Sequence, residues 1–287
     1  MLSFAELRAE VETLAGVLPG FDQISGFRTT AQPGAAPRSR SGLGEEFWQF
    51  RGQTPDDTAA AIDWRRSATG DELFIREHEL QSARLLSLWV DGSEGFDWKS
   101  EAAPFSKADC ARIILTAIGM RYSESGDLVN VIEGVNGLST SHHLVGPLLD
   151  DFMHLDSNMP GIPRPDTAQI ILASDFYGDL STIEDWVARE SVEGRTGVLL
   201  QLIDPLEKAF PFTGRVRFRI PGLRLERIFG RTELMKEAYL DRFKARADAL
   251  QSLARGVGWH FIQHCTEDPI APTAYQLMQT LNAEGIS

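Results

Sequence analysis

The segment Leu85–Gly95, with the sequence LLSLWVDGSEG, constrains the fold of this chain more than any other stretch. It begins as an apolar run and changes abruptly to turn residues at Asp91. A short apolar run that ends in turn residues is typical of a strand buried on both faces of a sheet. In an open α/β sheet, ligands bind beside the loops that leave the carboxyl ends of such strands. Asp91 and Ser93 therefore offer oxygen ligands to a hard cation at that edge.

Strand-like and helix-like segments alternate along the chain after residue 83. Further strands are predicted at Asp127–Glu133, Gln169–Ser174, Gly197–Ile203 and Trp259–His264. The alternation predicts an α/β fold with a mainly parallel, doubly wound sheet that carries helices on both faces. Asp175 directly follows one of these strands, as Asp91 follows another. Because the carboxyl ends of parallel strands meet at one edge, we expect Asp91 and Asp175 to share a rim.

A β-hairpin is predicted as an insertion in this alternation, over Arg215–Ile228. Apolar and arginine side chains alternate along its first strand, and a Pro-Gly pair marks the turn. One face of the hairpin then carries Arg215, Arg217 and Arg219. This face is a candidate docking surface for an acidic partner, and an ordinary solvated face is the alternative.

Three segments are predicted from these patterns. Residues 1–41 form an N-terminal helix and a linker rich in Pro, Gly, Ser and Arg. Residues 42–82 form an extension packed on the main domain, because its aromatic side chains need burial. These aromatic residues are Phe47, Trp48, Phe50 and Trp64. Residues 83–287 form the main domain.

Charge and cysteine content narrow the classes of function. The formal net charge of -13 argues against binding to nucleic acid or to an anionic membrane surface. Two cysteines far apart, Cys110 and Cys265, suit a reducing compartment and give no disulfide framework. The acidic N-terminus does not resemble a signal peptide, and no apolar stretch approaches the roughly 20 residues of a membrane span. We therefore expect a cytoplasmic protein without membrane insertion.

The segment before and through the first strand carries a specific succession of residues: G-E-E-F, R, D-D, I-D-W-R-R-S-A, L-F-I-R-E-H-E and then a strand ending in D-G-S. This succession resembles the DUF58 family, a family of unknown function, from about residue 42 to the C-terminus. The resemblance implies a von Willebrand factor A-like domain. It also implies an association with AAA+ ATPases of the MoxR class.

The resemblance further implies a metal site of the von Willebrand type, with a D-x-S-x-S motif, a threonine and a second aspartate. Asp91 and Ser93 match the first two positions of the motif, and Gly95 stands where the second serine belongs. Asp175 matches the later aspartate, and Thr140 is the best candidate for the threonine. The implied cation is Mg²⁺, which needs only a few protein oxygens. The alternative is that both aspartates cap helices and order their loops.

Two other groups of polar residues are candidate sites. Glu94 and Asp97 could act as paired carboxylates in hydrolysis, and a solvated acidic loop is the favoured interpretation. His143, Asp150 and His154 could share a helix face and bind a transition metal. Surface histidines without metal are the favoured interpretation of that group.

The leading hypothesis is a non-enzymatic interaction module, an adaptor between a MoxR-type AAA+ ATPase and a client protein. In its metal-dependent form, an acidic group of the partner completes the coordination shell of the cation. Glu94 and the arginine face of the hairpin are further candidate partner contacts. One alternative is a metal-assisted hydrolase that uses Asp91 and Asp175. The other is a metal-free structural scaffold, which Gly95 favours.

Overall fold

A computed structural model describes residues 2–24, 41–52, 74–79, 83–138, 143–220 and 225–284 of the chain. The chain divides into two compact units. The main unit comprises Met1–Phe27 and Arg84–Ser287, and the second unit comprises Arg28–Ala83. The N-terminal helix thus belongs to the same compact unit as the sheet.

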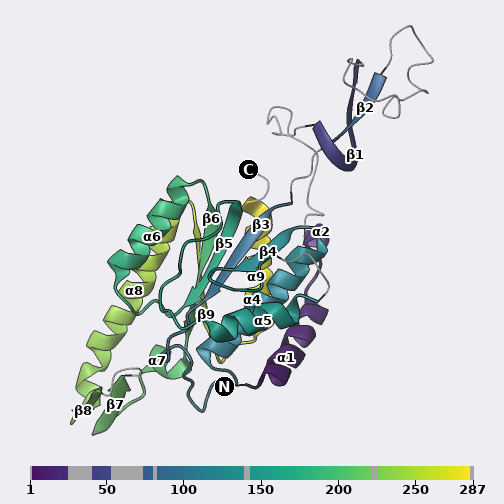
Figure 1. The fold of residues 1–287 in the computed structure, drawn as a ribbon. Coiled ribbons are helices and arrows are strands. Elements are labelled where there is room, and N and C mark those ends of the chain that lie inside the picture. The colour runs from purple at the N-terminus through teal and green to yellow at the C-terminus, as the bar shows by residue number, and fades with distance from the viewer. Residues whose placement is uncertain are drawn as a thin grey trace. The chain divides into compact units, whose positions relative to one another are not determined.

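The centre of the main unit is a five-stranded sheet with the order β4-β3-β5-β6-β9 (Figure 1). Every neighbouring pair in it is parallel. The strands are β3 (Leu85–Val90), β4 (Leu128–Val131), β5 (Thr167–Ser174), β6 (Thr196–Ile203) and β9 (His260–Cys265). This arrangement confirms the predicted α/β fold with a mainly parallel sheet. The sequences of these strands are largely continuous apolar runs because helices cover both faces of the sheet.

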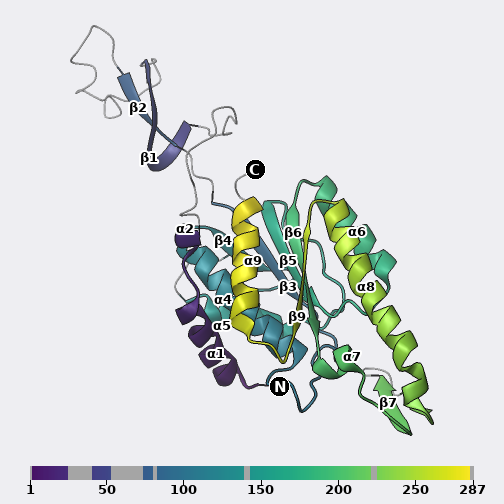
Figure 2. The same cartoon turned by 180° about the vertical axis from the view of Figure 1, so that it is seen from behind.

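Helices cover both faces of the sheet, as the two opposite views show (Figures 1 and 2). One face carries α4 (Lys107–Glu124), α5 (Val145–His154) and α9 (Ile270–Glu284), and α1 (Phe4–Val17) packs on these helices, mainly on α4. The other face carries α6 (Leu180–Val192) and α8 (Lys236–Gly256). Short elements complete the unit: α2 (Phe21–Ile24), α7 (Pro205–Ala209) and the 3₁₀ turn η3 (Thr232–Met235). Each face has its own apolar core against the sheet.

The strand predicted over Asp127–Glu133 is shorter than the apolar pattern indicated. It ends at Val131, and Glu133 adopts a left-handed backbone conformation with φ of 67°. A residue in that region cannot continue a strand, so the chain turns there.

The predicted hairpin is confirmed as β7 (Val216–Ile220) and β8 (Leu225–Phe229), which pair antiparallel. Aromatic contacts hold it to the rest of the unit. The ring of Phe210, at the end of α7, lies 6.1 Å from that of Phe218 in β7 and 4.5 Å from that of Tyr239 in α8. The hairpin is therefore anchored near the N-terminal end of α8.

The second unit contains an antiparallel pair, β1 (Ser41–Gly52) and β2 (Phe74–Glu79), whose register shifts on either side of Phe47. The side chains of both strands lie outside the described residues, as does Trp64. The packing predicted for residues 42–82 on the main domain stays a prediction.

None of the helices in the described part of the chain combines the length and the apolar character that crossing a bilayer requires.

Candidate functional site

The strand order creates a crevice between β3 and β5. The chain passes from β3 to β4 on one side and later returns to β5 on the other side of β3. At such a switch point, the loops that leave neighbouring strands diverge, and ligands of open α/β sheets bind outside the carboxyl ends there. Asp91 follows β3 and Asp175 follows β5. The structure therefore places both aspartates at one rim of the sheet.

A cleft of about 840 Å³ opens at this rim, and both aspartates line it. The loop after β3 contributes Trp98, the loop after β5 contributes Tyr177, and α7 contributes Glu207. The hairpin and α8 contribute Phe218 and Tyr239, and residues 156–160 before β5 line another part of the cleft. The side chains of Trp98 and Tyr177 are 41% and 40% exposed, so these two rings present accessible apolar surface at the cleft.

Asp91 is buried at the inner end of this cleft, with 4% of its surface exposed. Its Oδ1 accepts a hydrogen bond from the backbone N–H of Ser93 at 2.9 Å, and its Oδ2 accepts one from the hydroxyl of Ser174 at 2.6 Å. Burial raises the pKa of the Asp91 carboxyl, and the nearby charge of Asp175 adds to this, while the hydrogen bonds oppose it. Neutral dipoles thus support this carboxylate.

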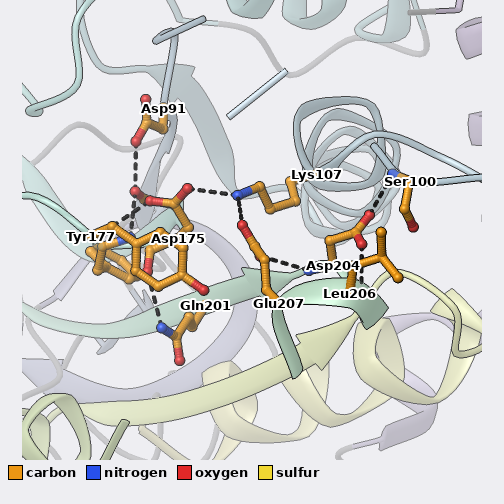
Figure 3. A network of polar contacts seen from close by, with 11 residues as sticks. Asp91, Ser100, Lys107, Asp175, Tyr177, Gln201, Asp204, Leu206 and Glu207 are labelled. Carbon is orange, nitrogen blue, oxygen red and sulfur yellow. Dashed lines mark hydrogen bonds and ion pairs between the residues drawn. The ribbon is translucent and has the colours of Figure 1, made fainter. Parts of the chain in front are cut away.

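Asp175 instead pairs with a buried lysine (Figure 3). The ammonium of Lys107 lies 2.8 Å from Asp175 Oδ2 and 2.8 Å from Glu207 Oε1. Lys107 is only 1% exposed, and the ring of Tyr177 lies 5.3 Å from its nitrogen. Burial alone would lower the pKa of the ammonium, but the charges of the two carboxylates outweigh it and raise that pKa. Lys107 is therefore held as a cation.

Helix α7 fixes the second carboxylate of this network. Asp204 caps the helix, its carboxylate accepting hydrogen bonds from the N–H groups of Leu206 and Ser100. Glu207 Oε2 accepts from the N–H of Asp204, which completes a capping box, while Oε1 accepts from Lys107. Figure 3 shows the chain of contacts that runs from Asp175 through Lys107, Glu207 and Asp204 to Ser100. The orientation of Glu207 is thus set by the helix start itself.

Two bulky residues that line the cleft adopt left-handed backbone conformations. Phe176 has φ of 54° and Phe210 has φ of 40°. Such conformations are strained for residues with a Cβ, and they persist where the surrounding structure determines them. The N–H of Phe176 donates to Ser174 Oγ, and Phe210 ends α7 and packs on Tyr239. Strain of this kind collects at functional sites.

The residues at this rim do not fit the divalent cation that the D-x-S-x-S resemblance implies. Both oxygens of Asp91 accept hydrogen bonds, and those of Asp175 accept from Lys107 and from the N–H of Tyr177. A divalent ion at Asp175 would also lie beside an ammonium, whose charge repels it. Gly95 lines the cleft without an oxygen-bearing side chain, and Thr140 lies outside the described residues. In the described parts of the chain, no three His, Cys, Asp or Glu side chains converge as a metal site requires.

The other predicted site residues lie partly in the cleft and partly outside it. Ser93, Glu94 and Arg219 line the cleft. Arg215 and Arg217 are exposed on the hairpin outside it, and Arg217 lies 3.5 Å from Glu226. In the His143, Asp150 and His154 group, the ring of His154 contacts the backbone and carboxylate of Asp150 in an exposed setting.

Lys107 and Glu207 were not anticipated from the sequence. A local signal existed for Glu207, because Asp204-Pro205-Leu206-Glu207 has the pattern of a capping box with Pro at the first helical position. That pattern predicts where a helix begins, but it does not predict a contact with Lys107, which lies 100 residues away.

Comparison with known proteins gives a family-model match over part of the chain and distant structural similarity. No curated protein matches the chain. The conserved hypothetical protein BatB from Bacteroides thetaiotaomicron is 10% identical, covering 71% of this chain and 100% of its own, with a TM-score of 0.43. An aerotolerance-related membrane protein from Bacteroides fragilis NCTC 9343, with multiple mutations to serines, is 12% identical, covering 70% and 100%, with a TM-score of 0.41. The family described as "Protein of unknown function DUF58" matches residues 49–139.

Proposed function

We propose that this protein is a non-enzymatic interaction module of the von Willebrand factor A-like type, and that it docks a partner protein in the cleft at the carboxyl edge of its sheet. The observation that carries the proposal is the cleft itself, about 840 Å³ in volume and walled by accessible aromatic rings. Tryptophan and tyrosine in a concave site are the residues that contribute most to protein interfaces. The cleft lies where open α/β sheets bind their ligands.

The docking site works without a metal ion in this proposal. In a metal-dependent site, a divalent cation links acidic residues of the loops and awaits an acidic group from the partner. Here Lys107 supplies a positive charge between Asp175 and Glu207. Asp91, after β3, accepts a hydrogen bond from Ser174 of β5, and Lys107 links Asp175, after β5, to Glu207, after β6. A rigid, preformed site loses less entropy when a partner binds.

The proposed partner is an AAA+ ATPase of the MoxR class, and this protein would link it to a client. That partner follows from the resemblance of the sequence to DUF58 proteins. The test is affinity capture of the protein from its own cells, with and without ATP and magnesium, for the wild type and two variants. Trp98→Ala removes an aromatic ring of the cleft, and Tyr275→Ala removes a ring of equal exposure, 41%, that lies on α9 outside the cleft.

The expected result is recovery of a ring ATPase with the wild type and with Tyr275→Ala, and its loss with Trp98→Ala. Equal recovery with both variants would refute docking in the cleft. Recovery of no ATPase under either nucleotide condition would refute the MoxR partnership.

A further inference from the structure

The cleft contains more carboxylates than cations. Its lining includes six acidic residues and two basic ones, Lys107 and Arg219. The acidic residues are Asp91, Glu94, Asp156, Asp175, Asp179 and Glu207. The formal surplus is therefore four negative charges, in a protein whose net charge is already -13. A concave surface with one sign of charge attracts ligands of the opposite sign.

The two cations in the cleft do not neutralise its inner end. The ammonium of Lys107 is shared between Asp175 and Glu207, at 2.8 Å from each. Arg219 is exposed on the hairpin, where solvent screens its charge. Asp91 is buried, and within the described residues its hydrogen bonds come from a hydroxyl and a backbone N–H. A buried carboxylate supported only by neutral dipoles is stabilised when a cation approaches.

Aromatic side chains form a large part of the rest of the cleft lining. Trp98 and Tyr177 are accessible, and Phe212, Phe218 and Tyr239 line the side formed by α8 and the hairpin. Aromatic faces attract ammonium and guanidinium groups, and they also cover the methylene stems of lysine and arginine. Lys107 already shows this pairing within the protein, because its nitrogen lies 5.3 Å from the ring of Tyr177.

Trp89 carries a buried donor in the cleft wall. It is 1% exposed and lines the cleft, and its indole Nε1 has no hydrogen-bond partner among the described residues. A buried donor left without an acceptor is costly. A carbonyl oxygen of a bound polypeptide is a group that can accept from an indole N–H.

We propose that the cleft binds a lysine or arginine side chain on an exposed segment of the partner protein, with its cationic head directed toward Asp91 and its stem against the aromatic wall. This inference rests on the proposed docking function and specifies its chemistry. It reverses the charge expected for a metal-dependent site, where the partner contributes an acidic group. The volume of the cleft exceeds that of one side chain, so residues that flank the basic one also enter it.

The test uses the full chain and three acetylated heptapeptide amides that differ only in the central residue, with leucines on both sides. The central residue is lysine, its uncharged analogue norleucine, or glutamate. Binding is followed by tryptophan fluorescence, because Trp89 and Trp98 line the cleft. The lysine peptide is expected to bind at least about tenfold more tightly than the norleucine peptide, with a preference that falls as salt is raised.

Two charge-removing variants and one matched control locate the effect. Asp91→Asn removes the buried charge of the cleft. Asp156→Asn removes an exposed charge of the cleft, and this substitution should leave the fold intact. Both should reduce the preference for lysine over norleucine, with the larger loss in Asp91→Asn. Asp248→Asn, an exposed position on α8 outside the cleft, should keep the full preference.

Equal binding of the norleucine peptide, tighter binding of the glutamate peptide, or no binding of any of the three would overturn the inference. So would an unchanged preference in both cleft variants. If recovery of the ATPase depends on Trp98 but is unchanged in Asp91→Asn and Asp156→Asn, docking in the cleft stands and the basic ligand is refuted. If the lysine preference holds but no partner depends on Trp98, the ligand chemistry stands and the docking function is refuted.

Discussion

Replacing Lys107 by methionine tests the central contact of the site. Methionine has a similar length and no branch, so it fills the same space without the charge. The variant leaves Asp175 and Glu207 facing each other without the cation that lies 2.8 Å from each of them. Their side chains are only 14% and 16% exposed, so water replaces the lost ammonium poorly.

The size of the loss follows from two opposing terms. At an effective dielectric constant of about 20, each contact at 2.8 Å contributes roughly 6 kcal/mol of attraction. Burying an ammonium at 1% exposure costs several kcal/mol, which offsets much of this. Removing one partner of a buried ion pair costs about 3–5 kcal/mol in measured cases. We expect Lys107→Met to lower the free energy of unfolding by about 3 kcal/mol at pH 7.

The assay is urea denaturation at pH 7 and pH 5, with Lys236→Met as the control. Lys236 is also the first residue of a helix, α8, but it is exposed, so its loss should change stability by less than about 0.5 kcal/mol. In Lys107→Met the unpaired carboxylates are relieved by protonation, so the penalty should shrink as the pH falls to 5. A loss below about 1 kcal/mol at pH 7, or one that grows at pH 5, would refute the reasoning.

Four further results are expected. The pKa of Lys107 is raised in the folded protein, so its stabilisation is complete below about pH 10 and is lost as the pH rises through the folded-state pKa; denaturation midpoints between pH 8 and pH 12 should show the wild type losing its advantage over Lys107→Met. Lys107→Ser removes the ammonium that repels a divalent ion, so about 5 mM MnCl₂ should raise the melting temperature of this variant and not that of the wild type. A rise in the wild type that disappears in Asp91→Ala would contradict this. In Gly92→Ala the new Cβ would lie 2.2 Å from the backbone oxygen of Leu155, so the unfolding free energy should fall by about 2 kcal/mol; unchanged urea midpoints would count against it. Asp204→Ala removes the acceptor of two backbone N–H groups and should cost about 2–3 kcal/mol, measured in the same way, whereas Asp204→Asn should cost less.

The sheet was predictable because its strands carry a strong signal. A strand covered by helices on both faces must be apolar along its whole length, and Leu85–Val90 is buried at every position. Once the strands are parallel, their carboxyl ends share an edge, which brings Asp91 and Asp175 to one rim without any further information. The hairpin was predictable for a related reason, because the alternation of arginine and apolar residues has the period of a strand.

The contacts within the site were not predictable from the sequence. Lys107 is 68 residues from Asp175 and 100 residues from Glu207, and no periodicity connects positions so far apart. The resemblance to a metal site concerns the oxygens of the loops, and it assigns no role to the first residue of a helix. The aromatic wall was not predictable either, because Trp98, Tyr177 and Tyr239 come from separate loops and helices that are far apart in the sequence.

One local feature did contradict the ordinary rules of helix design at the site. Lys107 is the first residue of α4, where it places a positive charge at the positive end of the helix dipole. This placement costs about 0.3–1 kcal/mol and favours no contact within the helix. It becomes favourable only through Asp175 and Glu207, which belong to other strands and helices. A residue that breaks a local rule and is compensated only by distant groups is the expected mark of a functional site. Because this cation is covalently part of the chain, the rim keeps its geometry at any concentration of divalent ions, and the docking site that we propose would be formed before a partner binds.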